Sequence, residues 1–331
     1  MAVQTIQTLD YRDFQDGSPE QSKKFCQALC DTLSTWGFAK IRNSTIPDAV
    51  IDELFQYNKR FFALPENIKH KAAHPAAPNP HRGWSAVGQE QLSRIAGFEK
   101  DEERDGFVPE FRESFDQGAA DDELFPNRWV DESDLPGFRK FMENYYDQCH
   151  NFHNHLLRAI SAGLNLPEDL LLSRHQTDTS ELRILHYPSI PCAQLKSAMR
   201  IGEHSDFGTL TLLLQDSVGG LQVEDQKRPG TFIPVESDSI YEIIINVGDC
   251  LQRWTNRELQ SANHRVHLPE GKDAKSGDVL AERYSVAYFG KPDREVLVDT
   301  LPEFCRDGKS RYNDHMNALQ YNQTKLLRTY A

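Results

Sequence analysis

The sequence predicts a mainly β protein with flanking helices, and two patterns carry this prediction. From Glu181 onward, short apolar runs follow one another and are separated by Gly, Pro and Asp. Many short strands at short spacing are typical of a β-sandwich or β-barrel, and the jelly roll is one such architecture. Before Glu181, apolar residues recur every three or four positions, which is the period of an amphipathic helix.

The expected helices lie mainly in the first half of the chain. Helical periods run through Gln21 to Leu33, Pro47 to Phe62 and Phe138 to Leu164, whereas Trp36 to Ile41 alternates like a strand. We expect the longest helix to pack behind the β core. Another helix is expected over Ser310 to Leu327, where it could close over the core as a lid.

The strands expected in the second half are Glu181 to Pro188, Gly208 to Leu214, Leu221 to Val223, Phe232 to Val235, Tyr241 to Asn246 and Arg283 to Phe289. This order predicts four regions. Residues 1–120 form an N-terminal region of mixed helix and strand that supplies a pocket wall. Residues 121–175 form a helical backing segment, residues 176–300 the β core, and residues 301–331 a helical tail.

Charge and composition exclude some classes of protein. The 331 residues carry 37 Lys and Arg against 50 Asp and Glu, a net charge of −13. Such a chain is poorly suited to bind a phosphate backbone, so we expect no nucleic-acid partner. The sequence has no apolar run of about 20 residues and no basic segment followed by an apolar one at its start. Six scattered cysteines without a CxxC pair fit a reducing compartment, so we expect a cytoplasmic protein.

A metal site is indicated by His204-Ser205-Asp206. On an extended chain residues i and i+2 point to the same face, so His204 and Asp206 can bind one ion. Two histidines and one carboxylate on one face are typical of non-haem Fe(II) oxygenases. His264 is the candidate for the second histidine and His267 is its nearest rival, although an isolated histidine such as His264 is more often a core histidine that is hydrogen-bonded to backbone. His150, His153 and His155 lie on the long helix, where we expect surface or boundary positions.

Further motifs make the sequence similar to a known family. The His204 motif is followed by His264-Arg265-Val266 and by Arg283-Tyr284-Ser285. In this order they resemble the Fe(II)/2-oxoglutarate dioxygenases of the isopenicillin N synthase-like family, and members from fungal specialised metabolism in particular. The resemblance implies a double-stranded β-helix (jelly-roll) core. It also implies that His204, Asp206 and His264 bind Fe(II), with O2 as cosubstrate.

The resemblance also implies a 2-oxoglutarate site. Arg283 and Ser285 are i, i+2 neighbours, and an arginine fork pairs well with the distal carboxylate of 2-oxoglutarate. Tyr187 aligns with a family tyrosine near this cosubstrate. The segment from His264 to Arg283 is longer than in the family and reads as an enlarged hairpin loop between two pairing strands. This departure leaves Arg294 as a fallback anchor.

The implied reaction consumes 2-oxoglutarate and O2, releases succinate and CO2, and hydroxylates, desaturates or rearranges a small organic molecule. Candidate substrate residues are His81, Ser85, Phe207 and Phe289, and we expect a monomer or weak homodimer. Two alternatives stay open. One is an oxidase like isopenicillin N synthase, in which Arg283 and Ser285 would bind a substrate carboxylate and no 2-oxoglutarate is used. The other is a jelly-roll protein that binds metal without catalysis.

Overall fold

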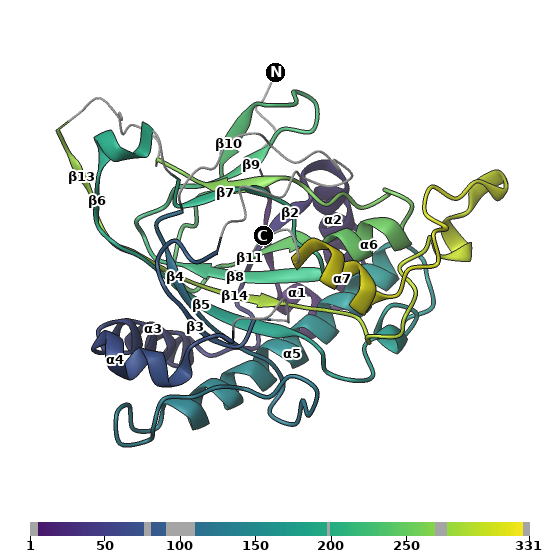
Figure 1. Cartoon of the computed structure of the whole chain (residues 1–331). Coiled ribbons are helices and arrows are strands. Elements are labelled where there is room, and N and C mark those ends of the chain that lie inside the picture. Colours follow the sequence, from purple (N-terminus) through teal and green to yellow (C-terminus); the bar gives the residue numbers. More distant parts are fainter. Residues whose placement is uncertain (1–5, 76–80, 91–109, 197–198, 269–276, 327–331) are drawn as a thin grey trace.

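Two β-sheets lie face to face, and helices cover the outer side of the larger one (Figure 1). The computed structural model describes residues 6–75, 81–90, 110–196, 199–268 and 277–326. Within these residues, no helix is long and apolar enough to cross a membrane.

The larger sheet has eight strands in the order β1-β2-β11-β8-β14-β5-β4-β3. Its strands are β1 Thr8–Asp10, β2 Phe38–Arg42, β11 Ile243–Val247, β8 Leu210–Gln215, β14 Arg283–Phe289, β5 Glu181–Tyr187, β4 Glu113–Gln117 and β3 Gly83–Ser85. Neighbours pair antiparallel, except that β1 and β2 are parallel.

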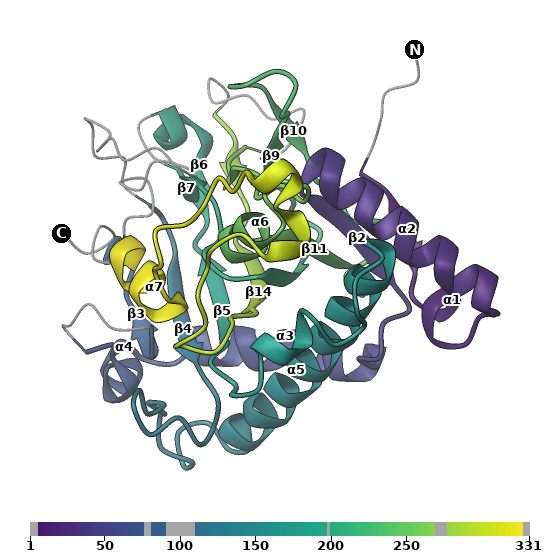
Figure 2. The same ribbon diagram turned by 90° about the vertical axis from the view of Figure 1, so that its right-hand side faces the viewer.

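The smaller sheet has four strands in the order β10-β9-β12-β7. They are β10 Phe232–Pro234, β9 Leu221–Glu224, β12 His264–Val266 and β7 Ile201–His204. A two-stranded sheet pairs β13, Val279–Leu280, with β6, Ile190–Pro191. Figure 2 shows the two main sheets from the side, with β9 and β10 away from the helical layer that contains α5.

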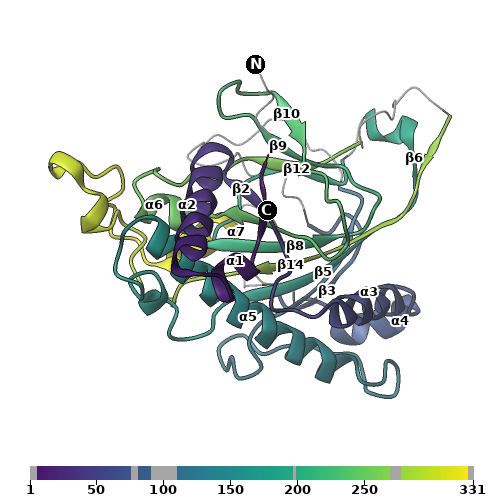
Figure 3. The same cartoon turned by 180° about the vertical axis from the view of Figure 1, so that it is seen from behind.

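The helices are α1 Arg12–Gln15, α2 Pro19–Trp36, α3 Asp48–Phe62, α4 Glu66–Lys69, α5 Phe138–Gly163, α6 Asp249–Trp254 and α7 Ala318–Leu326. Local signals fix the ends of α2. Ser18 and Gln21 form a capping box, Pro19 occupies the first turn, and Gly37 ends the helix with φ 71°. Figure 3, seen from behind, shows α2 and α5 on the outer side of the larger sheet, and these two helices pack against each other.

Strand β11 illustrates how side chains divide between two cores. Ile243, Ile245 and Val247 pack into the core that the larger sheet shares with α2, α3 and α5. Ile244 points to the opposite face and joins the core between the two sheets, because side chains alternate along a strand. Asn246 lies on that same inner face, so the strand delivers one polar side chain to the space between the sheets.

Most expected elements are present, but two details were wrong. The C-terminal helix begins at Ala318 instead of Ser310, because His315 adopts a left-handed φ of 55° and Arg253 binds Asp314 outside any helix. The strands β12 and β14 do not form a hairpin: β12 pairs with β7 and β9, and β14 pairs with β5 and β8. Their connection instead crosses from the smaller sheet to the larger one. Residues 269–276 of that connection lie outside the described residues.

Candidate active site

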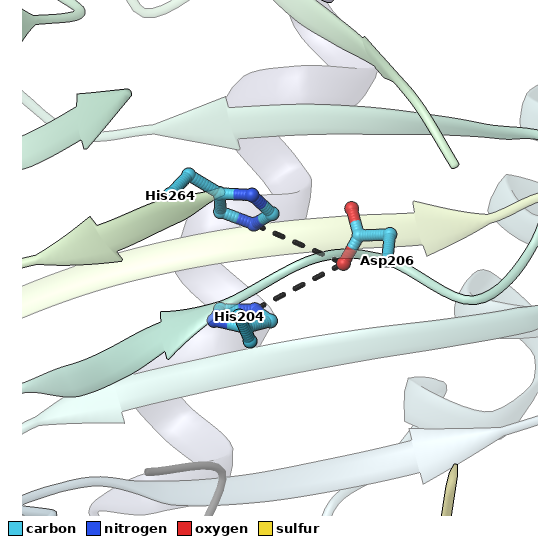
Figure 4. A group of neighbouring side chains, drawn as sticks. All are labelled: His204, Asp206 and His264. Atoms are coloured by element: carbon cyan, nitrogen blue, oxygen red, sulfur yellow. Dashed lines mark ion pairs between the residues drawn. The ribbon is translucent and has the colours of Figure 1, made fainter. Parts of the chain in front are cut away.

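Three side chains converge between the sheets. His204 ends β7 and His264 begins β12, where they are paired residues of the antiparallel ladder. Both Nε2 atoms face one carboxylate oxygen, with Asp206 Oδ1 lying 3.9 Å from His204 and 3.8 Å from His264 (Figure 4). The three possible ligand atoms lie within 4.8 Å of one another, and all three residues are buried. Among the described residues this is the one cluster with metal-ligand geometry.

Hydrogen bonds to the backbone orient the two imidazoles. His204 Nδ1 lies 2.8 Å from the carbonyl oxygen of Gly202, and His264 Nδ1 lies 3.2 Å from that of Ala262. A proton on Nδ1 satisfies these contacts and leaves the Nε2 lone pairs free for a metal. Burial and the neighbouring His264 lower the pKa of His204 to about 3, while Asp206 acts in the opposite direction. His204 is therefore neutral near pH 7, the form that binds metal.

The carboxylate of Asp206 is held by its other oxygen. Oδ2 accepts hydrogen bonds from Thr211 Oγ1 at 2.5 Å and from Asn246 Nδ2 at 2.6 Å. Burial alone would raise the pKa of Asp206, but the two imidazoles and these hydrogen bonds outweigh it and lower that pKa. Oδ1 consequently points at the histidines with a negative charge. One carboxylate and two imidazoles form a donor set that fits Fe(II).

Removing the amide that holds Asp206 should weaken metal binding. We expect Asn246→Leu to raise the Kd for Fe(II) by roughly 10–100-fold, because residues that orient a metal ligand typically contribute that much. Anaerobic Fe(II) titration measures the change. Asn144→Leu, on the exposed face of α5, is the matched control and should bind Fe(II) like the wild type. Equal Fe(II) affinity in both variants would contradict the orienting role of Asn246.

A buried arginine lies in the same inter-sheet space. Arg283 is 1% exposed, and its Nη1 and Nη2 donate to Ser285 Oγ at 3.1 Å and to Gln215 Oε1 at 2.8 Å. Its Nε has no hydrogen-bond partner, and no carboxylate pairs with the guanidinium in the described part of the chain. The guanidinium also lies over the Tyr187 ring, 4.8 Å from its centre. A buried cation is costly unless an anion pairs with it, so this group is suited to bind an anionic ligand.

One cavity joins the histidine cluster to this arginine. Its walls contain His204, Asp206 and His264 together with Tyr187, Arg283 and Ser285, and the larger and smaller sheets both contribute to it. The predicted metal residues and the predicted 2-oxoglutarate residues thus meet in one space. Arg294, the fallback anchor, lies elsewhere and binds Asp122 at 2.7 Å.

A second cavity shares two residues of the histidine cluster with the first. His204 and Asp206 line it, as do three of the predicted substrate residues, His81, Phe207 and Phe289. The fourth, Ser85, is buried on β3 and is not among the residues that line either cavity. Burial lowers the pKa of His81 to about 3, so this wall residue is uncharged near pH 7.

The structure also corrects the expectation for one helical histidine. His153 is 1% exposed instead of lying at the surface or boundary, and its Nε2 lies 3.1 Å from Thr209 Oγ1. His150 is partly buried beside Asp178, and His155 contacts Tyr11. None of these three belongs to the metal cluster.

Sequence reasoning missed several polar residues of the site. Thr211 and Gln215 lie on β8 four positions apart, and Asn246 lies on the buried strand β11. A usable signal existed: polar side chains at even spacing within a strand otherwise made of Leu or Ile indicate an inward polar face. Asn322 of α7 was missed as well, although it lines the second cavity.

Comparison with known proteins gives consistent matches. Residues 6–132 match the family described as non-haem dioxygenase in morphine synthesis N-terminal, and residues 168–292 match the 2OG-Fe(II) oxygenase superfamily. The 2-oxoglutarate-dependent dioxygenase gloF of Glarea lozoyensis is 82% identical over 98% of this chain and 99% of its own length. The proline hydroxylase buaE of Petromyces alliaceus is 51% identical over 98% and 99%, respectively. The crystal structure of a full-length Neurospora crassa protein in complex with alpha-KG is a structural neighbour, with a TM-score of 0.86, 31% identity and coverage of 97% and 96%.

Proposed function

This chain belongs to the 2OG-Fe(II) oxygenase superfamily, and from that premise we propose which of its residues carry the reaction. It is a 2-oxoglutarate-dependent dioxygenase that oxidises a small molecule, as the sequence motifs predicted. The jelly-roll fold and the use of iron, 2-oxoglutarate and O2 are confirmed for the family. The residue roles and the substrate are proposals.

His204, Asp206 and His264 bind the Fe(II) ion in our proposal. The observation that carries it is the cavity that these three residues share with Arg283 and Ser285. Bound Fe(II) supplies the activation of O2. The protein supplies two imidazoles and a fixed carboxylate, and all three of these residues are buried.

Arg283 and Ser285 bind the distal carboxylate of 2-oxoglutarate, so that its keto acid end lies toward the iron ligands. Tyr187 covers the guanidinium from one side. In the overall reaction, one oxygen atom of O2 enters succinate and the other enters the substrate, and 2-oxoglutarate supplies two electrons as it loses CO2. This use of 2-oxoglutarate is favoured over the oxidase alternative by the family match and by the alpha-KG complex of the Neurospora crassa neighbour.

The substrate in our proposal is a small amino acid, with free L-proline as the leading candidate, and the outcome is hydroxylation. The support is the 51% identical relative that is named a proline hydroxylase. The second cavity is compatible with a zwitterion. Its walls carry Glu181, Arg183 and Lys291, whose charges are balanced by ion pairs within the protein, so a ligand without net charge adds no unbalanced charge there.

Succinate release tests this proposal. With Fe(II), 2-oxoglutarate and O2 present, we expect L-proline to raise succinate formation at least about ten-fold over the substrate-free rate, with one hydroxyproline formed per succinate. The matched control is cyclopentanecarboxylate, which keeps the ring and carboxylate but lacks the amine. If L-proline does not stimulate succinate formation in an enzyme that still consumes 2-oxoglutarate, the substrate assignment is contradicted. The cosubstrate assignment then stays intact.

We further propose a cytoplasmic monomer or weak homodimer that binds no nucleic acid. All six cysteines are free, which suits a reducing compartment. The net charge of −13 disfavours binding to a phosphate backbone.

A further inference from the structure

Helix α7 forms one wall of the second cavity. Asn322 and Leu326, one turn apart on α7, line it together with His204 and Asp206. The helix is fixed close to the metal site, since Tyr321 Oη donates to Asp249 Oδ2 at 2.8 Å. The backbone N–H of Asp249 in turn donates to the carbonyl oxygen of Asp206 at 2.7 Å. The position of Asn322 is therefore tied to that of a metal-site residue.

The side-chain amide of Asn322 is buried without satisfying its hydrogen-bonding capacity. The residue is 8% exposed, and its Oδ1 is buried without a hydrogen-bond partner among the residues that the structure describes. The amide makes no hydrogen bond to any other residue within the described ranges. A buried acceptor without a partner is unfavourable, and native proteins retain few of them. At the wall of a ligand cavity, such a group is suited to bind the ligand.

The charged groups on the same wall are already paired within the protein. Glu181 forms an ion pair with Lys291 at 2.7 Å. Arg183 binds Asp116 at 2.6 Å and Glu90 at 3.0 Å. A substrate that relied on one of these charges would have to break an existing pair, which leaves a buried charge uncompensated. Recognition through a neutral group avoids that cost.

We propose that Asn322 is a substrate-binding residue whose side-chain carbonyl accepts a hydrogen bond from an N–H of the substrate amine. This rests on the proposed function and deepens it: the enzyme selects a small molecule with an N–H donor. A singly charged molecule would add an unbalanced charge beside the paired wall, whereas a zwitterionic amino acid would not. The C-terminal helix is accordingly part of the specificity site, besides covering the core.

The variant Asn322→Leu tests the proposal, because it keeps the approximate volume and cannot form hydrogen bonds. L-proline is titrated anaerobically into the Fe(II)·2-oxoglutarate enzyme, and its Kd is read from the change in the visible charge-transfer band. We expect the Kd for L-proline to rise at least ten-fold and the Kd for 2-oxoglutarate to stay unchanged. The Tm should not fall, since the lost amide has no hydrogen-bond partner within the described residues. Thr324→Ala, on the exposed face of α7, is the control and should match the wild type in all three.

A ligand pair separates binding from a general disturbance of the pocket. Tetrahydrofuran-2-carboxylate has a ring oxygen in place of the amine, so Asn322→Leu should leave its affinity unchanged. Equal losses for both ligands, or an unchanged Kd for L-proline, would overturn the proposal. A fall in Tm together with weaker 2-oxoglutarate binding would overturn it too, by assigning Asn322 a structural role.

Failure of the proposed function gives a different result. If the wild type binds neither L-proline nor any other free amino acid, the amino-acid substrate is wrong and this inference is overturned with it. If the wild type binds L-proline and Asn322→Leu binds it equally well, the proposed function stands and only the role of Asn322 is wrong.

Discussion

His204→Ala is expected to lose Fe(II) and to reduce turnover to below about 1% of the wild type. The proposed metal site offers two Nε2 atoms and one carboxylate oxygen, and this change removes one of the three donors. The remaining pair cannot hold Fe(II) against exchange with solvent, since a metal site depends on ligand number and geometry. Iron content after desalting and succinate release together measure the effect.

His267→Ala is the matched control for this variant. His267 lies just beyond β12, is half-buried, and is the rival histidine that sequence reasoning considered. It should retain Fe(II) and turnover, because it lies outside the cluster of His204, Asp206 and His264. Full turnover in His204→Ala, or iron loss in His267→Ala, would show that the metal ligands are assigned wrongly.

Arg283→Met should weaken 2-oxoglutarate binding about 100-fold, which corresponds to roughly 3 kcal/mol. Arg283 is buried, is oriented by Gln215 and Ser285, and has no carboxylate partner within the described residues. The other arginine that lines the metal cavity, Arg183, is already paired with Asp116 and cannot replace it. Anaerobic titration of 2-oxoglutarate into the Fe(II) protein, followed by the charge-transfer band, gives the Kd.

Arg294→Met controls for the loss of a positive charge. Its guanidinium binds Asp122 and does not line the metal cavity, so the Kd for 2-oxoglutarate should stay at the wild-type value. An unaffected 2-oxoglutarate Kd in Arg283→Met would reject Arg283 as the anchor. If that variant instead lost affinity for the amino-acid substrate, the oxidase alternative would regain support.

The secondary structure that could be predicted is the part governed by local patterns. Helix α5 carries its apolar residues at helical spacing, and α2 carries a capping box and a terminal glycine. The pairing partners of β12 and of β14 could not be predicted from such local patterns. Whether a strand joins the strand that follows it or crosses to another sheet depends on contacts between distant residues, which local spacing does not encode.

The same distinction applies to the site. His204, Asp206, Arg283 and Ser285 could be proposed because i, i+2 residues on an extended chain share a face, and His264 because a motif accompanies it. Asn246 and Asn322 contribute only through the fold. Asn246 lies 40 residues from the Asp206 carboxylate it holds, and Asn322 reaches the cavity because α7 packs beside α6. Motifs thus predict the candidate chemical groups, and tertiary structure adds further residues that surround them.

The separation of the two sheets also limits the length of the cosubstrate that can bind between them. The two histidines belong to the smaller sheet, whereas Arg283 begins a strand of the larger one. In the proposed assignment, the cosubstrate spans this gap with a keto acid at one end and a carboxylate at the other. A diacid one carbon shorter or longer could reach both ends only if the sheets moved relative to each other. Close packing of the side chains between them resists that movement, so this assignment predicts that the core selects for carbon-chain length.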